Sequence, residues 1–153
     1  MRTLLIVHHT TSPSLEELLS AVISGATTDE ITGVHTEIRP ALAATASDVL
    51  EADGFILGTP ANLGYMSGAL KHFFDQIYYP CRLAKSGAPF GFYVHGNSDT
   101  SGAVRGVQTV TTGLGWQEVH APVLVIGQPT KENRDACWDL GATVAAQLSS
   151  TVD

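Results

Sequence analysis

The sequence predicts an α/β fold in which helices cover both faces of one parallel sheet. Five short strand-like runs recur along the chain, and each gap between two of them is long enough for one helix. All but the second of these runs are apolar throughout, which is typical of strands that are buried on both faces. Strands that alternate with helices through short connections indicate a doubly wound sheet of five strands and five helices.

The expected elements follow one another without a linker, an internal repeat or a low-complexity segment. We predict strands over residues 3–8, 33–38, 54–58, 90–95 and 122–127. We predict helices over residues 14–24, 47–52, 67–82, 101–113 and 133–149. A length of 153 residues is typical of one domain, so we expect a single domain over residues 1–153.

Two of the helices carry clear start signals. Ser12 and Pro13 are favoured at the beginning of a helix, and Leu15, Leu18 and Val22 follow them at helical spacing. Ser67 is placed in the same way before the third helix. Its apolar stripe consists of Leu70, Phe73, Phe74 and Ile77.

Composition and charge exclude several functional classes. Apolar residues make up 44% of the chain and charged residues 15%, which argues against disorder. Eight Lys and Arg against fifteen Asp and Glu give a net charge of −7, and the basic residues form no cluster that would bind nucleic acid or an anionic membrane. No apolar run approaches the length of a membrane helix, and the first strand is too short for a signal peptide. We therefore expect a cytoplasmic protein in which Cys81 and Cys137 are reduced.

Ligands of a doubly wound sheet bind at the carboxyl ends of the strands, which directs attention to three loops. The first loop joins the first strand to the first helix and is rich in hydroxyl groups. Hydroxyls and backbone N–H groups at the positive end of a helix dipole are suited to a phosphate. The alternative is that Ser12 and Pro13 only begin the helix.

The second and third loops contain glycines. The second runs from Gly58 to Ser67, and its glycines and free amides suit the edge of a flat ligand. The third runs from His95 to Gly102 and could also be an ordinary surface turn. Three such loops at one sheet edge would fit a phosphate, a ribityl chain and a planar ring.

The central part of the sequence resembles a known family. The matching residues are Asp53-Gly54-Phe55-Ile56-Leu57-Gly58-Thr59-Pro60, followed by Asn62, Gly64, Ser67, Leu70, Lys71, Phe73 and Asp75. They look like the second flavin loop and the following helix of flavodoxin-like FMN proteins, closest to the NAD(P)H-dependent FMN reductase and NAD(P)H:quinone oxidoreductase branches. The resemblance implies FMN as cofactor and a flavodoxin-like three-layer sandwich with strand order 2-1-3-4-5.

The resemblance also implies which residues hold the flavin. The phosphate loop would contain His9, Thr11, Ser12, Pro13 and Ser14. The ring would lie against Thr59, Pro60, Ala61, Asn62, Leu63 and Gly64, with Tyr65 as a neighbour. The third loop would contribute His95, Gly96, Asn97 and Gly102. Ser12 stands where the family usually has glycine and Pro13 lacks an N–H, so we expect a lower FMN affinity than in a typical flavodoxin.

Several functional interpretations remain at this point. An enzyme would pass a hydride from NAD(P)H through FMN to a quinone, a flavin or a similar acceptor. A flavodoxin-type carrier would instead exchange electrons with redox proteins, and a cofactor-free binding module could use the same crevice. The absence of a dense acidic run favours the enzyme, and Tyr78, Tyr79 and Trp116 are expected in the core or at a homodimer interface.

Three rival interpretations fail on individual residues. Receiver domains need acidic residues where this chain has His8-His9-Thr10 and Gly58-Thr59. Low-molecular-weight phosphatases need a cysteine after the first strand, and neither cysteine is there. A metal site is not expected either, because His8 and His9 are adjacent and adjacent strand residues point to opposite faces.

Overall fold

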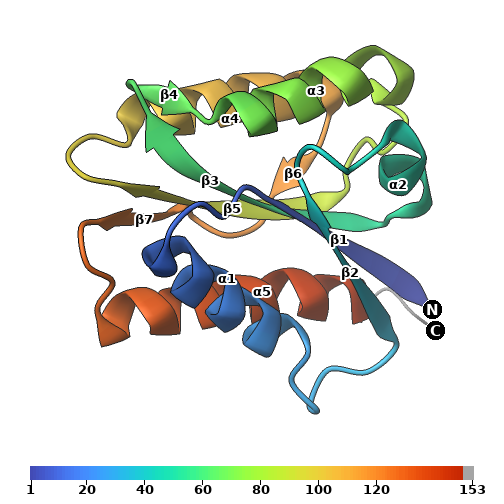
Figure 1. Cartoon of the computed structure of the whole chain (residues 1–153). Helices are drawn as coiled ribbons and strands as arrows, with labels where there is room; N and C mark the ends of the chain where they lie inside the picture. The colour runs from blue at the N-terminus through green and yellow to red at the C-terminus, as the bar shows by residue number, and fades with distance from the viewer. Residues whose placement is uncertain (150–153) are drawn as a thin grey trace.

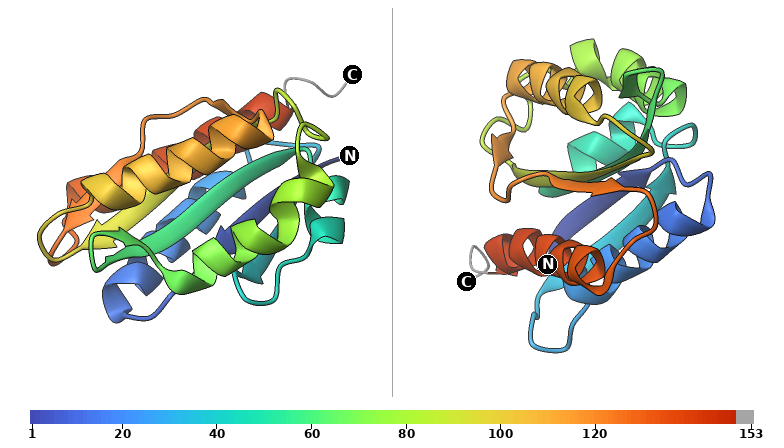
Figure 2. Two further views of the ribbon diagram at one scale, coloured as in Figure 1. Left: turned by 90° about the horizontal axis from the view of Figure 1, so that it is seen from above. Right: turned by 90° about the vertical axis from the view of Figure 1, so that its left-hand side faces the viewer.

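The computed structural model describes residues 1–149 and has three layers, with the sheet in the middle (Figure 1). Helices α1 (Pro13–Ala26) and α5 (Lys131–Ser149) cover one face of the sheet. Helices α2 (Ala46–Glu51), α3 (Gly68–Cys81) and α4 (Ser101–Leu114) cover the other, where α3 and α4 lie side by side (Figure 2). All five predicted helices are present, with ends that differ by a few residues.

The sheet has the predicted parallel topology. Strands β1 (Arg2–His8), β2 (Val34–Pro40), β3 (Gly54–Asn62) and β5 (Pro89–Gly96) stand in the order β2-β1-β3-β5. The expected fifth strand over residues 122–127 is β7 (Val123–Ile126), and an additional short strand, β6 (Gln117–Glu118), precedes it; the two pair with successive parts of β5. Between them the register against β5 shifts by two residues, because Phe90 pairs with Glu118 whereas Tyr93 pairs with Val123.

Strand β3 is longer than predicted, which corrects the expected second loop. It continues to Asn62 and turns back into the short antiparallel strand β4 (Tyr65–Met66). Ala61 pairs with Met66 and Asn62 with Tyr65, so Leu63 and Gly64 alone form the turn. Residues 59–62 were expected in a loop because Pro60 and the nearby glycines are typical of turns. Antiparallel pairing with β4 extends the strand past them.

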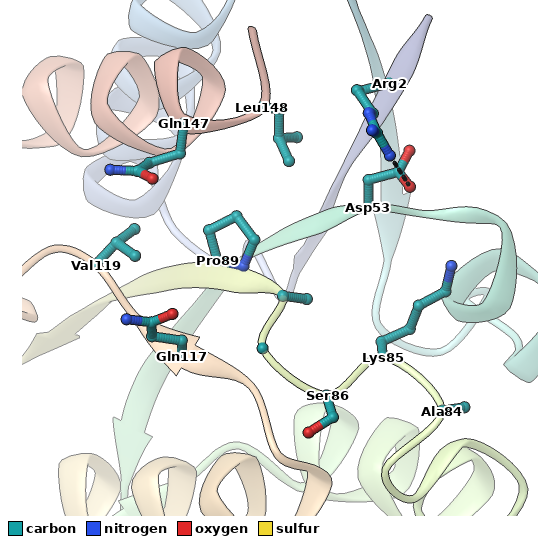
Figure 3. A pocket seen from close by; sticks show the side chains of 12 residues that line it. Arg2, Asp53, Ala84, Lys85, Ser86, Pro89, Gln117, Val119, Gln147 and Leu148 are labelled. Carbon is teal, nitrogen blue, oxygen red and sulfur yellow. Dashed lines mark ion pairs between the residues drawn. The ribbon is translucent and has the colours of Figure 1, made fainter. Parts of the chain in front are cut away.

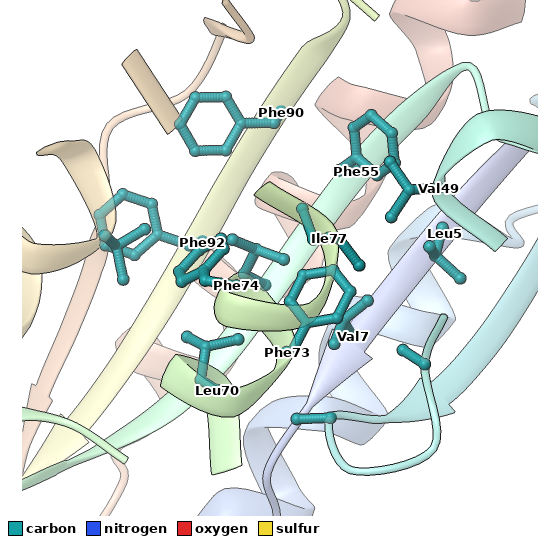
Figure 4. Packing of buried hydrophobic residues seen from close by; sticks show 14 of the residues in the cluster. Leu5, Val7, Val49, Phe55, Leu70, Phe73, Phe74, Ile77, Phe90 and Phe92 are labelled. Carbon is teal, nitrogen blue, oxygen red and sulfur yellow. The ribbon is translucent and has the colours of Figure 1, made fainter. Parts of the chain in front are cut away.

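Each face of the sheet has its own apolar core. Leu4, Ile6 and Tyr93 point toward α1 and α5. On the other face, Phe73 and Phe74 of α3 lie against β1, β3 and β5 (Figure 4). Trp116 is buried there and stacks on Phe55 with ring centroids 3.9 Å apart, as expected for a core residue. Tyr79, in contrast, is 84% exposed.

The second predicted strand is not apolar throughout because it forms β2, at the edge of the sheet. Its residues His35, Glu37 and Arg39 are only partly buried or exposed, and Glu37 lies 2.7 Å from His35 and 2.9 Å from Arg39. Charged side chains on an edge strand discourage pairing with another chain. Among residues 1–149, no helix is long and apolar enough to cross a membrane.

Candidate functional site

The three segments singled out by the sequence meet at the carboxyl edge of the sheet (Figures 1 and 2). The backbone N–H of His9 donates to the carbonyl of Gly58 at 3.0 Å, which joins the first loop to β3. Gly96 lies against Ala61, because a Cβ added to Gly96 would be 3.3 Å from that of Ala61. Gly102 of α4 lies against the carbonyl group of Gly64 in the turn. These contacts bring the loops together as the parallel topology requires.

The first loop begins α1 as predicted. The Ser12 hydroxyl accepts a hydrogen bond from the backbone N–H of Leu15 at 3.2 Å, and Pro13 is the first helical residue. Thr11 and Pro13 are exposed, and Ser14 is half-buried. The capping interpretation of Ser12 is therefore confirmed. It is compatible with a bound anion, because the positive end of the helix dipole remains at this loop.

The two histidines of this loop differ in their surroundings. The Nδ1 atom of His8 lies 2.7 Å from the Thr10 hydroxyl. Burial, followed by the charge of His9, holds the pKa of His8 below its usual value. The Nδ1 atom of His9 is buried and, within the described chain, has no hydrogen-bond partner. A buried polar atom without a partner is costly, so a ligand group at this loop is a natural partner for it.

Thr59 holds the hairpin formed by β3 and β4 rather than presenting its side chain to a ligand. Its side chain is fully buried. Its hydroxyl donates to the carbonyl of Pro60 at 2.8 Å and accepts from the backbone N–H of Ser67 at 2.9 Å. Thr59 as a whole is inaccessible to solvent, so it supports the hairpin that would border the ring and presents no exposed atom to it.

The turn of this hairpin has two residues with positive φ. Leu63 has φ +50° and Gly64 has φ +78°, the pattern of a tight two-residue hairpin turn. Leu63 is fully exposed at the tip, between the exposed residues Asn62 and Gly64. Tyr65 follows with 39% of its surface exposed. The turn thus presents backbone and an apolar side chain to the carboxyl edge.

The third segment is held by side chains at its two ends. The Nε2 atom of His95 lies 2.7 Å from the carbonyl of Gly127, so this histidine joins the ends of β5 and β7. The carboxylate of Asp99 accepts from the backbone N–H of Ser101 at 2.9 Å. That bond, followed by a hydrogen bond with the Ser101 side chain, holds the pKa of Asp99 below its usual value. Gly96 is buried, and Asn97 is exposed and faces the solvent side of the edge.

Sequence reasoning missed the roles of three groups at this edge. Thr10 is a partner of His8, Asp99 begins the turn into α4, and the hydroxyl of Thr59 closes the hairpin. The Asp99 role had a local signal, since aspartate often bonds a backbone N–H two residues later. Nothing near Thr59 in the sequence indicates its partner, which is eight residues away.

Hollows also lie outside the three loops, and two of them concern the edges of the sheet and the first loop. One of about 500 Å³ is at the opposite, amino edge of the sheet and is lined by Asp53, Lys85, Gln117 and others (Figure 3). Arg2 and Asp53 form an ion pair there at 3.7 Å. The other, of about 590 Å³, adjoins the first loop between Pro13, Glu17 and Arg134. Only the second hollow borders the predicted site.

The cysteines take no part in the site. Cys81 and Cys137 are buried, and burial raises the pKa of both thiols, that of Cys137 to about 12. Protonated, buried thiols are poor nucleophiles. Within residues 1–149 no three His, Cys, Asp or Glu side chains are grouped so that they could hold a metal ion.

Comparison with known proteins identifies the family. The family model for NADPH-dependent FMN reductase matches residues 11–131. The chain belongs to this family. All of the chain aligns with 90% of a flavodoxin from Aquifex aeolicus (strain VF5) at 26% identity.

Solved structures share the fold at lower identity. A flavodoxin from Streptococcus pneumonia TIGR4 superposes with a TM-score of 0.80 at 20% identity, over 95% of this chain and 99% of the flavodoxin. A WrbA-like flavodoxin from Agrobacterium tumefaciens has a TM-score of 0.76 at 16% identity, over the whole of both chains. The chain therefore has the flavodoxin-like fold that its sequence predicts.

Family membership makes FMN the cofactor of this protein, and the residues present fit it. The orphaned Nδ1 atom of His9 and the N-terminus of α1 are suited to its phosphate. The exposed turn at Asn62, Leu63 and Gly64, which lies against the backbone of Gly102, offers main-chain groups that suit the edge of a flat ring. No Lys or Arg lies in the first loop itself, and the nearby Arg134 lies 3.5 Å from Glu17.

Proposed function

We propose that this flavoprotein oxidoreductase takes a hydride from NADH or NADPH and passes electrons to a quinone, a flavin or a similar small acceptor. The family match and the edge of three loops support the flavoprotein part of this proposal. We infer the hydride donor and the acceptor from the uncharged, partly apolar turn that the protein exposes at this edge. We place this activity in the cytoplasm, where both pyridine nucleotides are available, and include a homodimer in the proposal.

The first loop would hold the phosphate of FMN. Thr11, Ser12 and Ser14 supply hydroxyls at the N-terminus of α1, and His9 supplies the imidazole nitrogen that lacks a partner. Pro13 gives no N–H, so the phosphate loses one donor that other residues would provide. This arrangement predicts binding through hydrogen bonds and the helix dipole, without an ion pair to Lys or Arg.

The flavin ring would lie along the edge that the hairpin turn and the third segment form together, since these two segments contact each other. Pro60, Ala61, Asn62, Leu63 and Gly64 would border one side of the ring, with Tyr65 next to them. Gly96, Asn97 and the start of α4 at Gly102 would form the adjoining part of the same border, and His95 holds that segment against Gly127. Bound FMN supplies the redox chemistry, and the protein sets the position and exposure of the ring.

One observation favours the enzyme over an electron carrier. The exposed turn consists of Asn62, Leu63, Gly64 and Tyr65 and contains no acidic residue. A carrier that docks on a redox protein through complementary charge would be expected to present an acidic face around its flavin. An uncharged, partly apolar turn is better suited to a small planar acceptor or to a nicotinamide ring.

The second candidate is a flavodoxin-type electron carrier. It is supported by the relative from Aquifex aeolicus, which is a flavodoxin and aligns over the whole of this chain. The net charge of −7 disfavours an anionic reduced flavin in either case and lowers the reduction potential. The net charge therefore does not distinguish the two candidates, in contrast to the local charge at the turn.

Rapid mixing of the FMN-loaded protein with NADPH or NADH under anaerobic conditions tests the proposal. We expect the absorbance of the bound flavin to bleach directly with at least one of the two nucleotides. Bleaching by dithionite or a reduced redox protein alone, with both nucleotides inert, would replace the enzyme by the carrier. Failure of the apoprotein to bind FMN would contradict both.

A further inference from the structure

Helix α4 carries glycines where other parts of the fold come closest to it. Gly102, Gly106 and Gly113 all lie within the helix. Glycine inside a helix costs up to about 1 kcal/mol relative to alanine, so several in one helix require a reason. In each case the reason is a neighbouring group that occupies the place of a side chain.

Two of these glycines receive the hairpin of the flavin edge. A Cβ on Gly102 would overlap the carbonyl oxygen of Gly64 in the turn. A Cβ on Gly106 would lie 2.5 Å from the ring of Tyr65 and 3.0 Å from the end of Met66. The third glycine is different, because a Cβ on Gly113 would overlap the hydroxyl of Tyr78 in α3.

The contact at Gly102 is between two stretches of main chain. A side chain can change rotamer to make room, but the carbonyl of Gly64 can move only if the turn moves. Asn62, Leu63 and Gly64 are exposed. At its other end the hairpin is fixed by the hydroxyl of Thr59, which bonds Ser67 and Pro60. The backbone of Gly102 therefore sets how closely the tip of the hairpin approaches α4.

We propose that Gly102 is a positioning residue for the flavin. The residue fixes the separation between the hairpin turn and the N-terminus of α4, the two segments that would border the ring. Gly106 contributes to the same contact, because the ring of Tyr65 packs where a side chain of residue 106 would lie. This inference rests on the proposed place of the ring, and it adds that one glycine outside the turn determines how the hairpin and the start of α4 are placed relative to each other at the ring site.

The test compares Gly102→Ala with Gly25→Ala. A Cβ on Gly25 would overlap the backbone carbonyl of Trp138, where α1 crosses α5. Both substitutions therefore force two stretches of main chain apart, but only one does so beside the hairpin. We expect both variants to unfold at lower urea concentration than the wild type. Gly102→Ala alone should raise the Kd for FMN about tenfold or more and shift the midpoint potential of the bound flavin.

A second pair keeps the test decisive if Gly102→Ala does not fold. Gly106 and Gly113 are on the same helix, and an alanine at either position places a methyl group against a tyrosine, Tyr65 of β4 or Tyr78 of α3. In the apoprotein, we expect faster amide exchange of hairpin residues 61–66 in Gly106→Ala, and unchanged exchange there in Gly113→Ala. A rise in the FMN Kd should likewise occur in Gly106→Ala alone.

The outcomes separate this inference from the proposed function. Wild-type protein that does not bind FMN would contradict the proposed function itself. Wild-type binding, with the same Kd and midpoint potential in Gly102→Ala and Gly25→Ala, would overturn only the positioning role. Equal exchange of residues 61–66 in Gly106→Ala and Gly113→Ala would overturn the role in the same way.

Discussion

Thr59 shows how one buried hydroxyl supports a site without contacting its ligand. It accepts a hydrogen bond from the N–H of Ser67 and donates one to the carbonyl of Pro60. We predict that Thr59→Val, which keeps the shape and removes the hydroxyl, lowers the free energy of unfolding by about 1–3 kcal/mol. The cost arises because the buried N–H of Ser67 is left without a partner. Urea unfolding of the apoprotein measures it.

Thr59→Ser is the matched control, because it keeps both hydrogen bonds and loses only a methyl group. We expect this variant to be more stable than Thr59→Val. A Thr59→Val protein as stable as the wild type would show that the hydroxyl does not hold the hairpin.

His8 should make the stability of the protein depend on pH. Burial and the charge of His9 hold its pKa in the folded state below the usual value of about 6.5. As the pH falls, the unfolded chain therefore takes up this proton first. The contribution of neutral His8 is fully present above about pH 6.5 and is lost as the pH falls from there through the lowered folded-state pKa.

Urea unfolding of the apoprotein between about pH 7 and pH 5 measures this dependence. We expect the free energy of unfolding to decrease toward low pH in the wild type. The decrease should be smaller in His8→Gln, which cannot take up the proton. Equal slopes in the two proteins would exclude His8 as a source of the effect.

Single residues were predictable where their partners are near in sequence. Ser12 and Ser67 were expected to begin helices, and each accepts from the N–H three residues later. His95 was expected in the flavin site, but its Nε2 atom lies against Gly127, 32 residues away. Contacts of this range depend on which strands become neighbours, which residue types alone do not specify.

At the scale of elements, the β3–β4 hairpin is where sequence and structure differ most. Its turn has Leu63 at a positive φ, whereas such turns usually have Asn, Asp or Gly at this position. A left-handed conformation costs a residue with a large side chain about 1–2 kcal/mol. Because leucine is not a usual turn residue, the sequence predicts a loop at these positions and not a hairpin.

This strain gives a prediction for the hairpin. Leu63→Asn produces the favoured Asn-Gly turn, and we expect it to raise the free energy of unfolding of the apoprotein by roughly 1 kcal/mol. Leu63→Ala is the control, because it removes the exposed leucine side chain without relieving the backbone. Thermal unfolding compares the three proteins, and a Leu63→Asn variant no more stable than Leu63→Ala would show that the turn is not strained.

The helices and central strands were predictable because local signals agree with the final packing. Apolar stripes and capping residues marked the helices, and continuous apolar runs marked β1, β3 and β5. The short strand β6 that precedes β7 was not predicted. Strands β6 and β7 are separate because the register against β5 shifts by two residues between them. A pattern of apolar residues does not specify which residues pair across two strands.

At the scale of the whole molecule, the strand order explains why the sequence could predict that these three segments are neighbours. Parallel strands bring their carboxyl ends to one edge, so loops far apart along the chain become neighbours. The first loop contains no Lys or Arg, so our proposal assigns the phosphate of FMN to hydroxyls, helix amides and His9. The electron donor and acceptor could not be predicted in the same way, because they are chosen by the exposed face of the bound ring.

The central claim is that these three segments together hold FMN. Titration of the isotope-labelled apoprotein with FMN, followed by the NMR shifts of its backbone amides, tests it most directly. We predict that the largest shifts fall in residues 9–14, 59–65 and 96–102 and that all three segments respond with one Kd. Shifts concentrated at the opposite edge, around Asp53, Lys85 and Gln117, or confined to one of the three segments, would contradict the account.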